Sequence, residues 1–165
     1  APSRMETAAP RTARAGAPHA AGRGNLVRQA VSLLVHFPGA GASVPLSDAL
    51  EQVDLPGIPL LVELLAQLRE DPVSSTAALL ERWRDRPDYG PLARLAVAEC
   101  LVPDEGAAAA EIRSALDRLV ADHALARLQS LHDKAQIESL TAEEKAELQG
   151  LLRAKAQSTR TPAPK

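Results

Sequence analysis

Residues 105–139, EGAAAAEIRSALDRLVADHALARLQSLHDKAQIES, form the longest uninterrupted pattern in this chain and decide its fold. The stretch contains no proline, and its only glycine stands second. Residues that suit the inner face of a helix recur at helical spacing, namely Ile112, Leu116, Leu119, Val120, His123, Ala126 and Leu131. Without interruption the stretch would span about 50 Å, at about 1.5 Å per residue. We therefore predict one long helix.

A second helix begins shortly after this stretch. Residues 141–144 read Thr-Ala-Glu-Glu, in which Thr141 can cap the helix while Glu144 reaches back to it. The helix that follows carries Leu148, Leu151 and Leu152. Because only a short connection separates the two helices, we expect them to fold back on each other as a hairpin.

The sequence before residue 103 is cut into shorter pieces by prolines and polar caps. Asn25, Ser74 or Ser75, and Asp88 are expected caps. The expected helices end near residues 37, 53, 69, 84 and 101. No alternating pattern is long enough for a sheet. The fold class is therefore all-α, with a compact bundle of about five short helices, then a long helix and a C-terminal helical hairpin.

Composition divides the chain into four segments. Residues 1–24 hold no leucine, isoleucine, valine or phenylalanine, so we expect a flexible linker rich in alanine, proline and arginine. The bundle is assigned to residues 25–102, and the long helix with the hairpin to residues 103–157. Residues 158–165, which include two prolines, are expected to be a disordered tail.

Composition and charge argue against several classes of function. The net charge is −2, whereas a domain that coats nucleic acid is normally basic, so we expect no direct nucleic-acid site. No apolar run approaches the roughly 18 residues of a membrane span, and no secretory signal is present. The single cysteine, Cys100, fits a reducing cytoplasm. Because the chain begins at Ala1 rather than methionine, we expect a fragment of a longer protein.

The usual catalytic and metal-binding patterns are absent from the sequence. It has no glycine-rich phosphate loop, no CxxC and no HExxH. His123 and His132 stand nine residues apart, too far to share a metal on one helix face. Charged residues of the long helix, such as Arg118 and Asp122, are expected to form a solvated face. We predict no catalytic residue, no metal and no cofactor in this chain.

The leucines of the last helix are the most informative surface feature. A pair of helices is too thin to bury both its faces. The three leucines therefore either pack fully on the long helix, near Leu128, Leu131 and Ile137, or leave an apolar strip for a partner. Each could contribute roughly 1.5–3 kcal/mol on burial. Association costs about 4–15 kcal/mol, so docking by this strip alone is expected to be weak and to need several copies.

Four segments resemble the C-terminal domain of bacterial DNA primases of the DnaG family. Residues 28–38, RQAVSLLVHFP, resemble the family's opening helix, an arginine followed by an aliphatic run and a proline stop. Residues 55–58 (LPGI) and 79–84 (LLERWR) resemble its L-P-G-hydrophobic turn and its L-L-E-x-aromatic-R helix. Residues 140–148 (LTAEEKAEL) resemble the start of its last helix. The four segments occur in the family's order and spacing.

The resemblance implies a docking function. In the family, the hairpin docks on the hexameric replicative helicase and so recruits RNA-primer synthesis to the replication fork. The matching helicase-binding residues here are Leu148, Leu151, Leu152 and Arg153. Zinc-binding and magnesium-dependent polymerase domains of the parent primase would precede Ala1, so that the chain itself would hold no catalytic site. The resemblance places the protein in the bacterial cytoplasm, at the replisome.

The resemblance also implies a second partner. In some relatives the bundle receives the acidic C-terminal tail of single-stranded-DNA-binding protein. The matching positions here are Arg23, Leu26, Val27, Arg28 and Arg94. Arginine stands where some relatives have lysine, which preserves the charge. The last helix departs further, with a glutamine at residue 149 where some relatives carry an aromatic residue.

Two alternative interpretations remain. A free-standing helical adaptor, or the N-terminal domain of a replicative helicase, would share the bundle fold. Primase motifs upstream would favour the primase domain, whereas a helicase motor downstream would favour the helicase. A nuclease or hydrolase is the third hypothesis, and metal-dependent turnover by this chain alone would reveal it.

Overall fold

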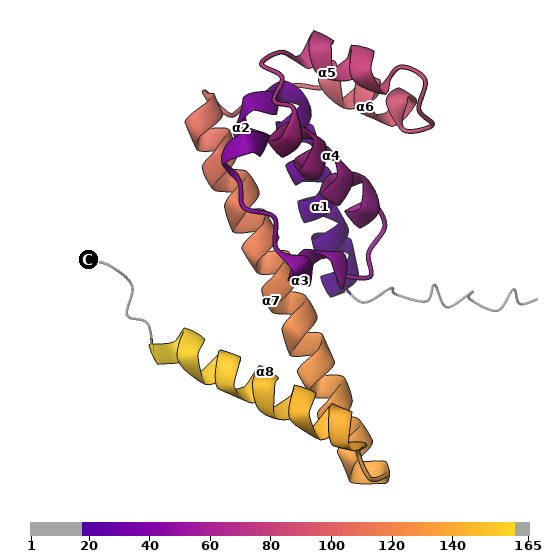
Figure 1. Cartoon of the computed structure of the whole chain (residues 1–165), viewed down its shortest axis with the longest axis vertical. Coiled ribbons are helices and arrows are strands. Elements are labelled where there is room, and N and C mark those ends of the chain that lie inside the picture. Colours follow the sequence, from indigo (N-terminus) through magenta and orange to yellow (C-terminus); the bar gives the residue numbers. More distant parts are fainter. Residues whose placement is uncertain (1–17, 161–165) are drawn as a thin grey trace, which may run out of the picture.

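The computed structural model describes residues 18–160, and within that range the chain consists of helices joined by loops, with no strand. In chain order the helices are α1 (Pro18–His36), α2 (Pro38–Ser43), α3 (Asp48–Glu51), α4 (Ile58–Glu70), α5 (Thr76–Trp83), α6 (Tyr89–Ala96), α7 (Glu105–Ile137) and α8 (Ala142–Arg160). Figure 1 shows a bundle gathered around one end of α7, with α8 folded back beside the other end. The predicted all-α fold is confirmed.

The hydrophobic core forms around α1, which packs against both α7 and α4. Aliphatic side chains at helical spacing line the inner face of each helix, and the fully buried ones include Leu34, Leu64 and Ile112. No polar or charged residue is buried in the described part of the chain. Each fully buried leucine or isoleucine contributes roughly 1.5–3 kcal/mol, so this core is the main source of stability.

Sequence signals explain where three of the helices begin. Gly57, just before α4, has a φ of +88°, a conformation that glycine adopts without steric cost, and Pro59 follows in the first turn. The Ser75 hydroxyl accepts a hydrogen bond of 3.2 Å from the Ala78 N–H at the start of α5. The Asp104 carboxylate accepts one of 2.8 Å from the Ala107 N–H at the start of α7.

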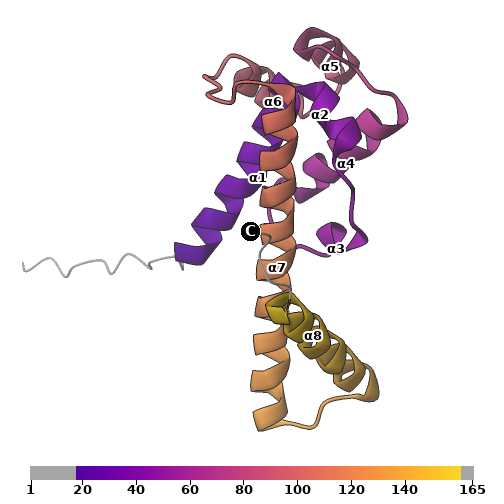
Figure 2. The ribbon, with the colours of Figure 1, turned by 90° about the vertical axis from the view of Figure 1, so that its left-hand side faces the viewer.

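Helix α1 begins at Pro18, whereas the sequence predicted a flexible linker up to residue 24 and a cap at Asn25. Proline suits a first helical turn because its missing N–H would have no partner there. The first turns of α1 diverge from α7 in Figure 2, and Gly22 and Arg23 line one side of a pocket whose other side is α7. At the other end, residues 158–160 continue α8. The remainder of the predicted linker and tail lies outside the described residues.

Helix α6 is shorter than predicted. It ends at Ala96 rather than near residue 101, and the Asp88 side chain makes no capping hydrogen bond. The apolar residues that suggested a longer helix, Val97 and Leu101, lie in a loop with more than four-fifths of their surface exposed. Their spacing was helical, but no neighbouring element packs against them to hold another turn of helix.

Helix α7 belongs to both parts of the molecule. Its first half supplies Ala108, Ile112, Leu116 and Leu119 to the bundle core, whereas beyond residue 119 only Leu131 is buried within the helix. Figure 2 shows this second half extending past the bundle, with α8 beside it. The predicted boundary at residue 103 therefore assigns α7 to the hairpin segment, although the first half of this helix forms part of the bundle core.

Close packing of α2 depends on a glycine. A Cβ atom at Gly41 would lie 2.7 Å from Cδ1 of Leu68, 3.0 Å from Cβ of the same residue, and 3.2 Å from Cδ2 of Leu34. The sequence predicted only a helix stop at Pro38, but the chain turns there and forms this short helix over the end of α4. Absence of a side chain at residue 41 lets the two backbones approach.

We predict that Gly41→Ala destabilises the bundle by about 1–3 kcal/mol, because the added methyl forces Leu68 and its neighbours to move. Gly24→Ala is the matched control, since a Cβ atom there meets nothing within 4 Å. The control is expected to stabilise the protein by about 0.5–1 kcal/mol through helix propensity. Urea unfolding monitored by circular dichroism measures both changes, and equal stabilities for the two variants would contradict the prediction.

Candidate functional site

The hairpin formed by α7 and α8 has little hydrophobic core of its own. Leu131 on α7 and Leu140 in the connecting loop are buried, but no residue of α8 is buried. Within the described chain α8 packs mainly on α7, and Figure 1 shows its C-terminal end diverging from that helix. Polar interactions near the turn therefore add to the few apolar contacts that hold the two helices together.

The N-terminus of α8 is capped by a reciprocal pair of hydrogen bonds. The Glu144 N–H donates to the Thr141 hydroxyl at 3.2 Å, and the Thr141 N–H donates to the Glu144 carboxylate at 2.9 Å. Two backbone N–H groups that have no partner within the helix are thereby satisfied. The capping box predicted from residues 141–144 is confirmed.

Two ion pairs join α8 to α7. The guanidinium of Arg127 binds the Glu147 carboxylate in a bidentate manner, with both N–O distances 2.8 Å. The Lys134 ammonium lies 2.6 Å from the Glu144 carboxylate and 3.6 Å from that of Glu138. Bidentate pairing fixes the rotation of one helix against the other, which a single point contact does not. We name these two cross-helix pairs, Arg127–Glu147 and Lys134–Glu144, the ionic clasp.

The ionic clasp perturbs the titration of its carboxylates. A hydrogen bond from Lys134, together with the backbone bond from Thr141, lowers the pKa of Glu144 below its ordinary value of 4.5. The hydrogen bond from Arg127 lowers the pKa of Glu147 in the same way. A carboxylate whose pKa is lower in the folded state stabilises that state above its unfolded pKa, and this stabilisation is lost as the pH falls through the folded pKa.

The three leucines of α8 remain accessible. Leu148 and Leu151 are half-buried, Leu152 is 50% exposed, and Arg153 is exposed. The sequence left open whether cross-packing would enclose these leucines, and the structure leaves part of their surface in solvent. We name Leu148, Leu151 and Leu152 the α8 leucine strip.

The far end of the hairpin carries an apolar residue that the sequence placed incorrectly. Ile137 was expected to pack against the leucines of the last helix, but it is 88% exposed. It is the final residue of α7, where the chain turns away before α8 begins. Helical spacing indicated that Ile137 faces the last helix, but α8 does not cover the end of α7 where this residue lies.

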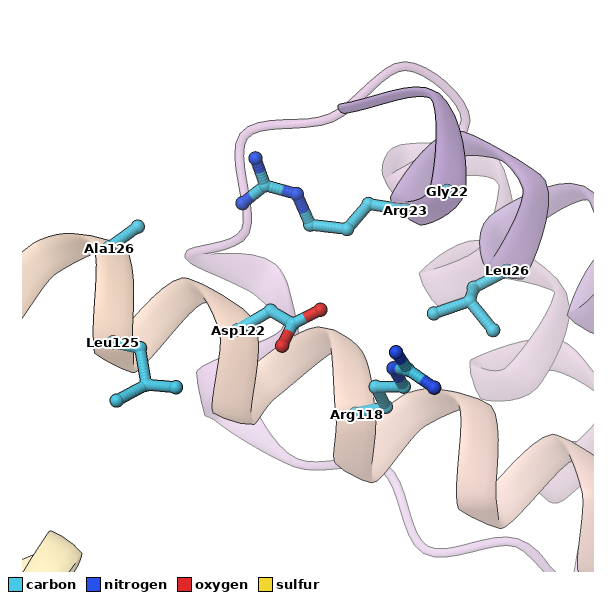
Figure 3. Close-up of a pocket in the computed structure, with 7 residues that line it drawn as sticks. All are labelled: Gly22, Arg23, Leu26, Arg118, Asp122, Leu125 and Ala126. Atoms are coloured by element: carbon cyan, nitrogen blue, oxygen red, sulfur yellow. The ribbon is translucent and has the colours of Figure 1, made fainter. Parts of the chain in front are cut away.

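A second candidate site is a surface pocket between α1 and α7. It has a volume of about 600 Å³ and is lined by Gly22, Arg23, Leu26, Arg118, Asp122, Leu125 and Ala126. Figure 3 shows the charged side chains of Arg23, Asp122 and Arg118 extending from the two helices toward the space between them. We name it the α1–α7 pocket.

The structure separates the five residues that the resemblance assigned to an acidic tail. Arg23 and Leu26 line the α1–α7 pocket. Val27 is only 2% exposed and belongs to the core, so the prediction that it takes part in a peptide site is not supported. Arg28 and Arg94 are exposed outside this pocket, the latter on α6, which packs against α1.

Sequence reasoning missed the α7 side of this pocket. Arg118 and Asp122 were expected to be solvated charges on a helix face; Arg118 is exposed, and both residues also line the pocket opposite α1. Their spacing of four residues puts them on one face of α7, and that signal was visible in the sequence. Nothing in the sequence indicated that the N-terminal part of α1 would lie across from them.

Two absences hold for the described residues 18–160. They contain no group of three or more histidine, cysteine, aspartate or glutamate side chains placed to hold a metal ion. None of their helices is long and apolar enough to cross a bilayer.

An all-helical bundle that extends a hairpin with accessible leucines, beside a pocket lined by arginine and leucine, defines a protein-docking module. The chain belongs to the DnaG DnaB-binding family of DNA primases, since residues 27–151 match that family's model. Its structure is similar to the crystal structure of the DnaG primase C-terminal domain from Vibrio cholerae. The two are 29% identical, with a TM-score of 0.59, and the match covers 77% of this chain and 96% of that chain. No curated protein matches this chain significantly in sequence.

We predict that acid opens the hairpin. Acid that protonates Glu144 and Glu147 removes both cross-helix pairs of the ionic clasp, and this requires a pH below the ordinary carboxyl pKa because their folded pKa values are lowered. Distances between spin labels at Ser114 and Gly150, in a chain with Cys100→Ser, report the opening. The mean distance is expected to increase and its distribution to broaden as the pH is lowered.

Glu147→Gln is expected to broaden the same distribution at neutral pH, because it removes the charge that Arg127 binds. Glu143→Gln is the matched control, since Glu143 lies in the same first turn of α8 and is exposed. A distribution that stays narrow in acid and in Glu147→Gln would contradict the role of the ionic clasp.

Proposed function

We propose that this chain docks on the replicative helicase through the hairpin of α7 and α8 and so holds a DNA primase at the replication fork. The observation that carries the proposal is α8 itself, a helix with no buried residue and with leucines still accessible. Family membership supplies the partner, because the family is described by its binding to the DnaB helicase.

The α8 leucine strip and Arg153 are the proposed contact residues. An amphipathic helix of this kind binds a groove between helices of a partner, which covers the leucines and leaves the charged face in water. Three leucine-sized contacts roughly balance the cost of association, so one copy binds weakly. A hexameric helicase presents its docking site several times, and several primases on one ring would raise the local concentration of primase at the fork.

Primer synthesis itself is assigned to other parts of the primase. The sequence holds no motif for phosphate or metal binding, which supports a chain that docks and does not catalyse. Zinc and magnesium chemistry would then belong to domains outside this chain. A place on the replicative helicase puts the protein in the bacterial cytoplasm.

A second proposed partner is the acidic C-terminal tail of single-stranded-DNA-binding protein. Support comes from the α1–α7 pocket, where Arg23 and Leu26 provide the positive charge and the apolar surface that an acidic peptide with an apolar end requires. Arg28 and Arg94 lie outside that pocket. In this proposal they bind acidic residues that precede the apolar end of the peptide, which then continues over α1 toward α6.

We predict that Leu152→Asp weakens binding to the cognate helicase by about tenfold to a hundredfold. This factor corresponds to losing the roughly 1.5–3 kcal/mol gained when one leucine side chain is buried. Leu152 is the most exposed of the three leucines, so its replacement leaves the bundle folded. Leu101→Asp is the matched control, because this exposed leucine lies in the loop before α7, at the opposite end of that helix. Calorimetric titration measures both, and equal affinities would contradict the proposal.

We predict that Arg23→Ala weakens binding of an acidic peptide about tenfold, because a charge-assisted hydrogen bond is lost. The probe is a short synthetic peptide rich in aspartate that ends in a phenylalanine with a free carboxylate. Arg69→Ala on α4 is the control, since Arg69 is exposed and lies outside the α1–α7 pocket. Fluorescence anisotropy gives both affinities, and an unchanged affinity for Arg23→Ala would place the peptide elsewhere.

A further inference from the structure

The α1–α7 pocket has two walls, and the peptide site proposed above uses residues of only one of them. Arg23 and Leu26 form the wall from α1, as the resemblance implied. The opposite wall consists of Arg118, Asp122 and Leu125 on successive turns of α7. These three residues follow at intervals of four and three, so they lie along one side of α7 and face the pocket together.

The two walls combine unlike charges with apolar surface. Arg23 and Arg118 approach the pocket from different helices, and the Asp122 carboxylate extends between them in Figure 3. Leu26 is half-buried and Leu125 is 50% exposed, so each leaves apolar surface for a ligand. The pocket therefore holds two positive charges and one negative charge beside its leucines.

We infer that the α7 wall sets the affinity of this pocket for acidic peptides, with Arg118 as an anion-binding residue and Asp122 as an internal competitor. The inference rests on the proposed binding of an acidic tail in this pocket. Arg118 presents a guanidinium that can bind a carboxylate with two parallel hydrogen bonds. The Asp122 carboxylate extends into the space where a ligand carboxylate would meet the arginines, and it repels that ligand.

Charge complementarity favours a carboxylate-bearing peptide over other occupants. A fully apolar helix would take the charged groups of Arg23, Arg118 and Asp122 out of water, which costs more than the burial of two leucines returns. A basic peptide would meet two arginines and only one aspartate. An acidic peptide with an apolar end places its carboxylates on the arginines and its last side chain against Leu26 and Leu125.

The two α7 residues have effects of opposite sign. Arg118→Gln removes a guanidinium and is expected to weaken binding of the aspartate-rich peptide about tenfold. Asp122→Asn keeps the shape of the side chain but removes its charge, and is expected to tighten binding about fivefold. A change that merely disturbs packing weakens binding and does not tighten it, so the gain from Asp122→Asn separates an electrostatic role from a structural one.

The test measures the affinity of the full chain for that peptide by fluorescence anisotropy. Arg113→Gln is the matched control, because Arg113 is an exposed arginine on α7 that does not line the pocket. A second peptide with asparagine in place of each aspartate and an amidated end reports binding that does not depend on charge. The expected result is weaker binding by Arg118→Gln, tighter binding by Asp122→Asn and no change for Arg113→Gln, with these differences absent for the uncharged peptide.

Two results overturn the inference, and they are distinguishable. If Arg23→Ala weakens binding while Arg118→Gln and Asp122→Asn do not change it, the peptide uses only the α1 wall. The proposed second partner then stands, and the role of α7 fails. If the chain does not bind the peptide, or if Arg23→Ala has no effect either, the proposed peptide site fails together with the inference. Circular dichroism confirms that each variant remains folded.

Discussion

The packing of α1 and α2 on the first half of α7 supports the rest of the molecule, because it buries the apolar face of that helix. Ile112 and Leu119 of α7 are completely buried against the bundle. Since a helix is stiff over its length, anchoring one half also directs the other half into solvent. The second half of α7 needs few contacts of its own to project from the bundle, and α8 needs only to fold against it. The position of α8 is thus determined by burial elsewhere in the chain.

Stability is distributed unevenly as a consequence. The bundle is held by tightly packed leucines and depends on close approaches such as the one at Gly41. The hairpin is held by two buried leucines, a capping box and the ionic clasp. Exposed ion pairs contribute little each and are screened by salt. Regions with few buried contacts open more readily than a core, and a binding element of this kind can adjust to its partner without unfolding the domain.

Sequence patterns predicted those features that depend on neighbouring residues in the chain. The long helix follows from residues 105–139, and the capping box at Thr141 predicted where α8 begins, because both signals are local. Features that depend on distant segments were missed. The N-terminal turns of α1 are helical although their composition resembles a linker, and Ile137 is exposed although its spacing matched a buried face. Arg118 lines a pocket because α1 lies opposite, which no pattern within α7 reveals.

Helix α7 also explains how one small domain can present two separate surfaces. Its middle, at Leu125 and Ala126, lines the α1–α7 pocket, and the next residue, Arg127, holds α8 through Glu147. Side chains on one helix point outward in different directions, so adjacent residues serve different neighbours without competing for space. The pocket combines a net positive charge with apolar walls, whereas the α8 leucine strip is apolar and flanked by charges. Because the chemistry of the two surfaces differs, a ligand suited to one is poorly suited to the other, and each surface can select its own partner.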